Sequence, residues 1–254
     1  MTRRNVRVAL LLTVAFALIV ATLLNAYRFG GLARATGDYE LARFWYRLAA
    51  VVGNPNAQNN LAGLYAEGLG GEQSDALAVK WFQMAADQGI SQAKFNLSNF
   101  YESGKGVSRD TKKAAALLES AADAGDIEAA FNLGNLYATG RDDFPKNVVQ
   151  SMAWYKRAAV RGFASAQYNL GCLYSQGRDT PKDLSLAGEW FTKAAQQGHA
   201  KAQLDLGTMY AFGLGYERNI AEGLRLLNKA ATDPSTAATA RERIKVLSSG
   251  AIVI

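Results

Sequence analysis

The sequence of 254 residues has one cysteine, one histidine and four prolines, and each shortage excludes a class of protein. The single cysteine, Cys172, rules out an intramolecular disulfide, so the fold depends on packing alone. The single histidine, His199, leaves no His/Cys cluster of the kind that holds a zinc ion. Four prolines in a chain that is 49% hydrophobic and 20% charged exclude a disordered, proline-rich protein. We therefore expect a folded protein without a metal centre or cofactor.

The excess of positive charge lies mostly at the N-terminus. No acid precedes Asp38, and without the four N-terminal arginines the formal net charge falls from +6 to +2. These arginines, which flank an apolar segment, are Arg3, Arg4, Arg7 and Arg28. A nearly neutral body offers no electrostatic basis for binding nucleic acid. We therefore expect no nucleic-acid partner.

Residues 8–27 carry no formal charge and predict a transmembrane helix. A helix of this length spans about 30 Å, at about 1.5 Å per residue, which matches the hydrocarbon core of a bilayer. Because arginines precede the segment, the positive-inside rule places residues 1–7 in the cytoplasm and the body of the chain outside it.

A cleaved signal peptide is the alternative, and it would give a secreted or periplasmic protein. The apolar region of a signal peptide is about 7–15 residues long and ends at a small-x-small site. Residues 24–26 have leucine where a small residue is needed, and cleavage after Ala17 would leave an apolar stub. These features favour an uncleaved anchor.

The body of the chain is a repeat. Five segments of the form AQNNLAGLYAEG begin at Ala57, Ala93, Ala129, Ala166 and Ala202, which are 36 or 37 residues apart. Each is followed by a second motif such as Trp81-Phe82-x-x-Ala85-Ala86-x-x-Gly89, and an extra copy of this second motif precedes the first repeat, at Trp45-Tyr46. A fixed period of this length predicts stacked supersecondary units.

Each repeat is predicted to fold as two helices, A and B. Ala57, Leu61, Leu64 and Tyr65 follow the spacing of one buried helical face, and Gly68 is placed where helix A ends in a left-handed residue. In helix B the paired alanines allow close helix approach while the aromatic pair fills the space between layers. One unit cannot bury its apolar face alone, so the units must stack.

Both ends of the array are predicted to be caps. The first helix B, near residues 38–52, is expected to lack a proper helix A because residues 21–36 belong largely to the membrane segment and to a short break at Gly30-Gly31. Asp233-Pro234 is predicted to begin a capping helix that reaches about Leu247. The expected segments are 1–7 (cytoplasmic), 8–27 (transmembrane), 28–56 (partial repeat), 57–92, 93–128, 129–165, 166–201 and 202–232 (repeats 1 to 5), and 233–254 (capping helix and tail).

These motifs closely resemble the Sel-1-like repeat family, relatives of the tetratricopeptide repeats. The quoted pattern is A-x-x-x-L-G-x-x-Y-x-x-G followed by A-x-x-W-[FY]-x-x-A-A-x-x-G, and it covers about residues 38–232. The resemblance implies an all-α, right-handed α/α superhelix preceded here by one transmembrane helix. It also implies a role as an adaptor or scaffold, and many bacterial members are exported. With the N-terminal segment, it predicts a bacterial inner-membrane protein whose repeats lie in the periplasm.

Residues with catalytic potential are isolated. His199 lies in a turn between repeats, where a surface residue is expected, and Cys172 lies on helix A without a histidine to activate it. The Gly-x-Gly sequences, such as Gly68-x-Gly70, are repeat loops and not a phosphate-binding motif. We expect no enzyme activity and no small-molecule substrate.

A second face of helix A is the candidate binding surface. At about 100° per residue, the third, seventh and tenth positions of the motif point away from the core, and the eleventh position flanks them. The candidate protein-binding residues at these positions are Phe95, Asn99, Phe131, Asn135, Tyr168 and Gln176. Aromatic rings supply contact area, and amides bind a peptide backbone. The alternative is that the aromatics only pack between adjacent A helices.

Two functions remain. The first is a membrane-anchored scaffold outside the cytoplasm that binds a segment of a partner protein in a groove. The second is a secreted repeat protein, or a periplasmic regulator of a sensor or envelope complex. The sequence does not identify the partner.

Overall fold

The computed structural model describes residues 3–141, 143–177 and 181–249. Within these ranges the chain is helical apart from turns, loops and one isolated bridge between Arg141 and Phe144. The expected all-α fold is therefore confirmed. The helices are α1 (Arg3–Ala35), α2 (Tyr39–Val51), α3 (Pro55–Glu67), α4 (Asp75–Asp87), α5 (Ser91–Ser103), α6 (Thr111–Asp123), α7 (Ile127–Thr139), α8 (Val148–Ala159), α9 (Ala164–Gln176), α10 (Leu184–Gln196), α11 (Ala200–Phe212), α12 (Ile220–Ala230) and α13 (Ala237–Ser248).

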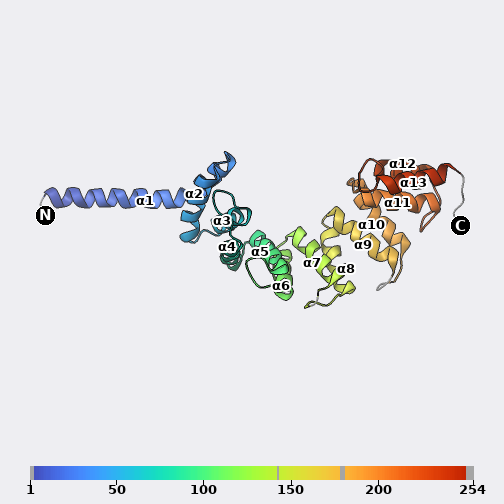
Figure 1. Ribbon diagram of the computed structural model, residues 1–254, viewed down its shortest axis with the longest axis horizontal. Helices are drawn as coiled ribbons and strands as arrows, with labels where there is room; N and C mark the ends of the chain where they lie inside the picture. The colour runs from blue at the N-terminus through green and yellow to red at the C-terminus, as the bar shows by residue number, and fades with distance from the viewer. Residues whose placement is uncertain (1–2, 142, 178–180, 250–254) are drawn as a thin grey trace. The chain divides into compact units, whose positions relative to one another are not determined.

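The helices pack in pairs of one A and one B helix. From α1/α2 to α11/α12, each odd-numbered helix lies against the even-numbered helix that follows it (Figure 1). The chain forms two compact units, Met1–Asp126 with α1 to α6 and Ile127–Ile254 with α7 to α13. Within each unit, the B helix of one pair packs against the A helix of the next. This is the stacking of neighbours that the repeat predicts.

Local sequence sets the helix ends. The A helices α3, α5, α9 and α11 end at glycines with left-handed backbone, such as Gly68 at φ 69°, as expected from the motif. Each B helix begins after a short polar residue that accepts the backbone N–H three residues later. These N-cap residues are Asp38, Ser74, Asp110, Asn147, Asp183 and Asn219.

The core is built from small and branched side chains at fixed positions of the repeat. Leu61, Leu97, Leu133 and Leu170, one on each of four successive A helices, are at most 1% exposed. The first alanine of each B-helix pair, such as Ala85 and Ala194, is at most 2% exposed. Burial of these apolar side chains is the main force that holds the helices together.

At the sixth position of the motif, helix A lies in close contact with helix B. A Cβ atom added to Gly171 would lie 2.6 Å from the ring of Phe191, and one added to Gly134 would lie 2.6 Å from the ring of Tyr155. No real side chain tolerates such a distance, so glycine at these positions lets the two helices touch through an aromatic ring. Ala62 and Ser98 occupy the same position in the first two repeats and are buried.

The N-terminal helix differs from the sequence expectation. The predicted break at Gly30-Gly31 is wrong, because α1 runs without interruption from Arg3 to Ala35. Its last residues form a helix A for α2: Ala26 is fully buried, and a Cβ on Gly30 would lie 2.6 Å from the ring of Tyr46. Glycine is tolerated inside this helix because the packing against α2 leaves no room for a side chain at Gly30.

The N-terminal part of α1 extends beyond the helix pairs of its unit (Figure 1). Thr13–Ala35 is long and apolar enough to cross a membrane, by length and composition. Val14, Phe16, Leu18 and Leu24 are between 50% and 77% exposed. This stretch of apolar surface therefore has no protein cover within the described chain.

The C-terminal cap begins later than predicted. Helix α13 starts at Ala237 after Thr236, not at Pro234, because the Asp233 carboxylate accepts the backbone N–H of Ser235 and closes a turn. Ala240 of α13 is fully buried in a cluster with Leu204 and Leu227, so α13 covers the last repeat as expected. Residues 250–254 of the expected tail lie outside the described ranges.

Trp154 tests the role of the large aromatics on helix B. Its side chain is 7% exposed, and the guanidinium of Arg157 lies 4.4 Å from the ring centroid. Trp154→Ala is expected to lower the free energy of unfolding by about 3–5 kcal/mol, the usual cost of deleting a large buried aromatic. Chemical denaturation of both proteins measures this, and a loss below about 1 kcal/mol would show that Trp154 does not fill the core.

Two glycines of the same helix type should respond in opposite directions. Gly171→Ala must displace the Phe191 ring and is expected to destabilise the protein by about 1–3 kcal/mol. Gly63 has no atom within 4 Å of an added Cβ. Gly63→Ala should therefore stabilise its helix by about 0.5–1 kcal/mol. Equal effects in thermal or urea unfolding would contradict the close approach at Gly171.

Candidate protein-binding face of the A helices

The candidate binding residues occupy the second face of helix A, at the third, seventh and eleventh positions of the motif. The aromatic side chains at the third position are half-buried; of the amides, Asn135 is half-buried and the other two are exposed. In order along the chain these residues are Phe95, Asn99, Phe131, Asn135, Tyr168 and Gln176. Leu204, the third-position residue of the last repeat, is 9% exposed and belongs to the core under α13.

Phe131 is wedged between two other aromatic rings. Its ring centroid lies 5.8 Å from that of Tyr155 on α8 and 5.0 Å from that of Phe163, which precedes α9. These contacts join one repeat to the next, so Phe131 has a packing role. The ring is nevertheless half-buried, which leaves part of its surface accessible from the A-helix face.

Tyr168 has a similar arrangement in the next repeat. Its ring lies 5.7 Å from Phe191 and is stacked on His199 at 4.7 Å. His199 is the N-cap of α11, where Nδ1 accepts the backbone N–H of Ala202. The expectation of a simple surface histidine is therefore corrected: burial lowers the pKa of His199, and the ring has a capping and stacking role.

Asn135 lies in a hydrogen-bonded row between repeats. Its side-chain oxygen accepts the Tyr155 hydroxyl at 2.6 Å and the Asn169 amide at 3.3 Å. With both lone pairs of the oxygen engaged, Asn135 presents its NH₂ group as a donor. The A-helix face therefore offers an oriented amide beside the Phe131 ring.

The first unit holds the other two candidates on α5. Phe95 is half-buried and Asn99 is exposed. The Ser98 hydroxyl donates to the backbone oxygen of Phe95 at 2.6 Å, and Ser103 donates to that of Asn99 at 2.7 Å. Both bonds are internal to the helix, so they position the backbone without engaging the two candidate side chains.

Asp205 is a residue of this face that the sequence analysis missed. It occupies the fourth position of the motif, where the other repeats have Asn60, Asn96, Asn132 and Asn169. The replacement of asparagine by aspartate in one repeat is the sequence feature that could have identified it. Burial raises the pKa of the Asp205 carboxyl, and the charge of Arg243 on α13 opposes this shift. Tyr168 donates its hydroxyl to Asp205 at 3.3 Å. Asp205 is thus a half-buried acid between two repeats.

The reactive groups near Asp205 are not poised for catalysis. Burial raises the pKa of the Cys172 thiol to about 11, so the thiol is protonated near neutral pH. Burial also raises the pKa of the Tyr168 hydroxyl. Among the described residues, no group of three or more His, Cys, Asp or Glu side chains is arranged to hold a metal ion. The chemistry of the face is hydrogen bonding and aromatic contact.

The comparisons with known proteins agree with this architecture. The family described as Sel1 repeat matches residues 25–50, 55–90, 91–126, 127–163, 164–199 and 200–234. The first match includes the end of α1, which supports its role as a helix A. No curated protein matches the chain.

Two solved structures are similar in both fold and sequence. One is c5321, a protective antigen of uropathogenic Escherichia coli with an SLR fold, at 31% identity and a TM-score of 0.78; the match covers 83% of this chain and 46% of that one. This chain thus spans about half the length of that relative. The other is a Sel1 repeat protein from Oxalobacter formigenes, at 32% identity and a TM-score of 0.70, with 81% and 83% covered.

Sel1 repeat proteins form non-catalytic scaffolds and generally mediate protein–protein interactions. Because six matched repeats extend from residue 25 to residue 234, the chain belongs to the Sel1 repeat family.

Proposed function

We propose that this protein is a membrane-anchored scaffold outside the cytoplasm that binds a segment of a partner protein on its A-helix face. The observation that carries the proposal is the combination of half-buried aromatic rings and an oriented amide on this face. Phe131 is held by Tyr155 and Phe163, and Asn135 is oriented by Tyr155 and Asn169. A surface that is already ordered loses little entropy when a partner binds.

The remaining candidate residues lie at the same motif positions, two of them in the first unit and one in the second. Phe95 and Asn99 supply a ring and an amide on α5, and Gln176 supplies an amide at the end of α9. None of the three carries a formal charge. A partner segment with apolar side chains and accessible backbone groups therefore suits this face better than a highly charged one.

The proposed anchor is the N-terminal part of α1. Thr13–Ala35 is long and apolar enough to cross a membrane, and its apolar side chains from Val14 to Leu24 are largely exposed. The preceding arginines favour a cytoplasmic N-terminus. Together these features support a bacterial inner-membrane protein with its repeats in the periplasm.

Packing at the start of the repeats favours retention of α1 over release by cleavage. Ala26 is fully buried, and the Tyr27 ring lies 5.9 Å from that of Tyr46. Cleavage after Ala26 would therefore cut through the helix A of the first pair and remove a core residue. The alternative, a secreted protein, requires this pair to lose part of its packing.

The anchor predicts a membrane-bound protein of full length. After fractionation of cells that express the chain, we expect the intact protein in the membrane fraction, extractable by detergent and not by high salt or carbonate. N-terminal sequencing of this material should begin at or next to Met1. A soluble periplasmic or secreted form with a new N-terminus near Leu18 or Tyr27 would contradict the anchor and favour the secreted alternative.

Phe131→Ala tests the binding face. A partner is first captured from membranes with a photoreactive amino acid at Asn99, then purified for binding measurements. We expect Phe131→Ala to weaken binding by about 1–3 kcal/mol, as for a moderate hot spot. Its cost in stability should be well below that of Trp154→Ala because the Phe131 ring is only half-buried.

The packing alternative makes the opposite forecast, a large loss of stability without a separate binding defect. Thermal melts and binding curves on the same Phe131→Ala protein distinguish the two. Val149→Ala is the matched control, since Val149 is 67% exposed on the B helix α8 and should affect neither measurement. A folded Phe131→Ala protein that binds normally would exclude Phe131 from the binding face.

A further inference from the structure

Helix α2 has two apolar faces, although a helix in this position needs only one. Its buried face consists of Ala42, Tyr46, Ala49 and Ala50 and packs in the core. A second set of apolar residues is exposed or half-buried and spans about 120° of the helix surface at about 100° per residue. This outer face of α2 consists of Leu41, Phe44, Trp45, Leu48, Val51 and the C-cap Val52.

Part of the outer face is specific to α2: Trp45 repeats the first aromatic position of the helix B motif, but Phe44 does not. Phe44 is 54% exposed, and the residues at its position in the later B helices are Lys80, Ala116, Ala153, Glu189 and Arg225. Val51 is 68% exposed, and its counterparts are polar in four of the five later copies of the motif (Asp87, Asp123, Gln196 and Thr232), the exception being Val160. The repeat tolerates polar residues at these positions, so the apolar residues on α2 are not required by folding.

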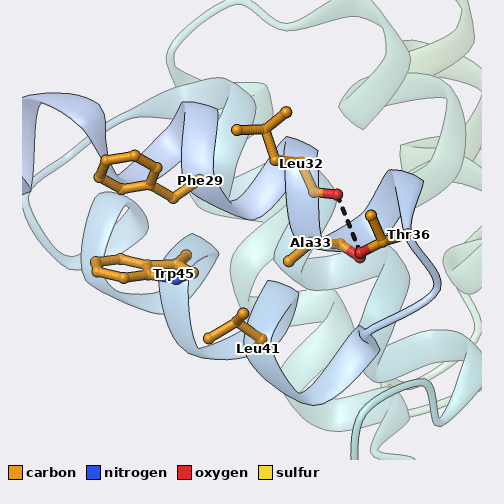
Figure 2. A pocket seen from close by; sticks show the side chains of 6 residues that line it. All are labelled: Phe29, Leu32, Ala33, Thr36, Leu41 and Trp45. Atoms are coloured by element: carbon orange, nitrogen blue, oxygen red, sulfur yellow. Dashed lines mark hydrogen bonds between the residues drawn. The ribbon is translucent and has the colours of Figure 1, made fainter.

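The outer face of α2 is continuous with apolar surface on α1. Phe29 and Trp45 lie with ring centroids 5.0 Å apart, and Phe44 contacts Trp45 edge-on at 5.1 Å. Figure 2 shows Phe29 and Leu32 from α1 beside Leu41 and Trp45 from α2, around an open apolar hollow of about 320 Å³. Phe29, which directly precedes Gly30, is 39% exposed, whereas Leu133, which directly precedes the equivalent Gly134, is 1% exposed. No earlier repeat covers this end within the described chain.

The pairing of α1 and α2 directs the outer face toward the proposed membrane segment. Leu41 lies near Thr36, and Trp45 and Tyr46 lie near Phe29 and Tyr27, so the two helices run antiparallel. Val51 and Val52, at the end of α2, therefore return alongside the part of α1 that precedes Tyr27. This places their exposed side chains next to the residues expected in the bilayer.

The charges around this surface suit anionic lipid headgroups. Arg28, Arg34 and Arg47 are exposed, while the acids of the same segment are Asp38 and Glu40. Arg43 is directed elsewhere, since its guanidinium lies 3.9 Å from the Tyr65 ring centroid and donates to the backbone oxygen of Glu72. Residues 25–53 therefore carry a net positive charge next to an aromatic surface, and aromatic side chains are enriched at both membrane–water interfaces.

We propose that the outer face of α2, together with Phe29 and Leu32, lies in the interfacial layer of the membrane that α1 enters. The proposal rests on the proposed membrane anchor and goes beyond it, because it assigns a second, peripheral contact to the first repeat. The aromatic and aliphatic side chains occupy the boundary between headgroups and acyl chains, about 5–10 Å deep, as in other amphipathic interfacial helices. The arginines contact the phosphates above them.

Depth-dependent fluorescence quenching tests this placement on the full chain. Cys172→Ala removes the native thiol, and a single cysteine is then introduced by Phe44→Cys and labelled with an environment-sensitive fluorophore. The protein is reconstituted in vesicles of phosphatidylethanolamine and phosphatidylglycerol, some with a nitroxide near the headgroup end of the acyl chains. We expect the nitroxide to remove about half of the fluorescence, because the label lies at the depth of an interfacial helix. Iodide in the aqueous phase should have little effect.

Two control positions separate this proposal from the anchor. Ala116→Cys labels the same position of α6, which is exposed and should be quenched by iodide and not by the lipid nitroxide. Phe16→Cys labels α1 itself and should be quenched by a nitroxide at the middle of the acyl chain. Val51→Cys provides a second label on the outer face and guards against misfolding of the Phe44→Cys protein.

The outcomes are distinct. Quenching by lipid at Phe16 and at the outer face supports both the anchor and the interfacial contact. If lipid quenches the label at position 16 but iodide quenches the labels at positions 44 and 51, the interfacial contact alone is overturned. The outer face would then be available to a protein partner. Absence of lipid quenching at Phe16 overturns the anchor and, with it, the contact that depends on the anchor.

Discussion

The close contact between helix A and the aromatic or leucine side chain of helix B is the constraint on which the rest of the structure depends. Where helix A has Gly134 or Gly171, the ring of Tyr155 or Phe191 occupies the space of a missing side chain. This contact fixes the distance between the two helices of a pair. The fixed distance in turn allows the next A helix to pack against helix B. The same packing between helices therefore recurs from repeat to repeat within each unit.

The period of the sequence was sufficient to predict the helices, their pairing and the glycines that end them. The predictions of helix ends failed where contacts made by other residues override a local preference. Gly30-Gly31 favours a break in an isolated helix, yet α1 continues because Tyr46 packs on Gly30. Asp233-Pro234 resembles a helix start, yet the Asp233 side chain closes a turn and Thr236 precedes the helix.

The candidate binding face could be predicted only as a set of residues on one side of helix A. Helical periodicity places Phe131 and Tyr168 on this side, but it does not determine which rings they touch. That depends on residues far along the chain, such as Phe163 and His199, which pack beside them. Asp205 was missed because its effect depends on burial, and burial is not visible in a single exchange of asparagine for aspartate. The same rings thus serve packing and remain partly available for recognition.

The continuity of α1 has a mechanical consequence. Proteins are commonly attached to membranes through flexible linkers, which let the attached domain rotate and search a volume set by the length of the linker. Here one helix leads directly into the first pair without an intervening coil. In the proposed arrangement, a tilt or rotation of the anchor within the bilayer therefore turns the first pair by the same angle. Such a rigid connection restricts the search volume of the first repeat, and it gives a partner in the same membrane a fixed height at which to meet it.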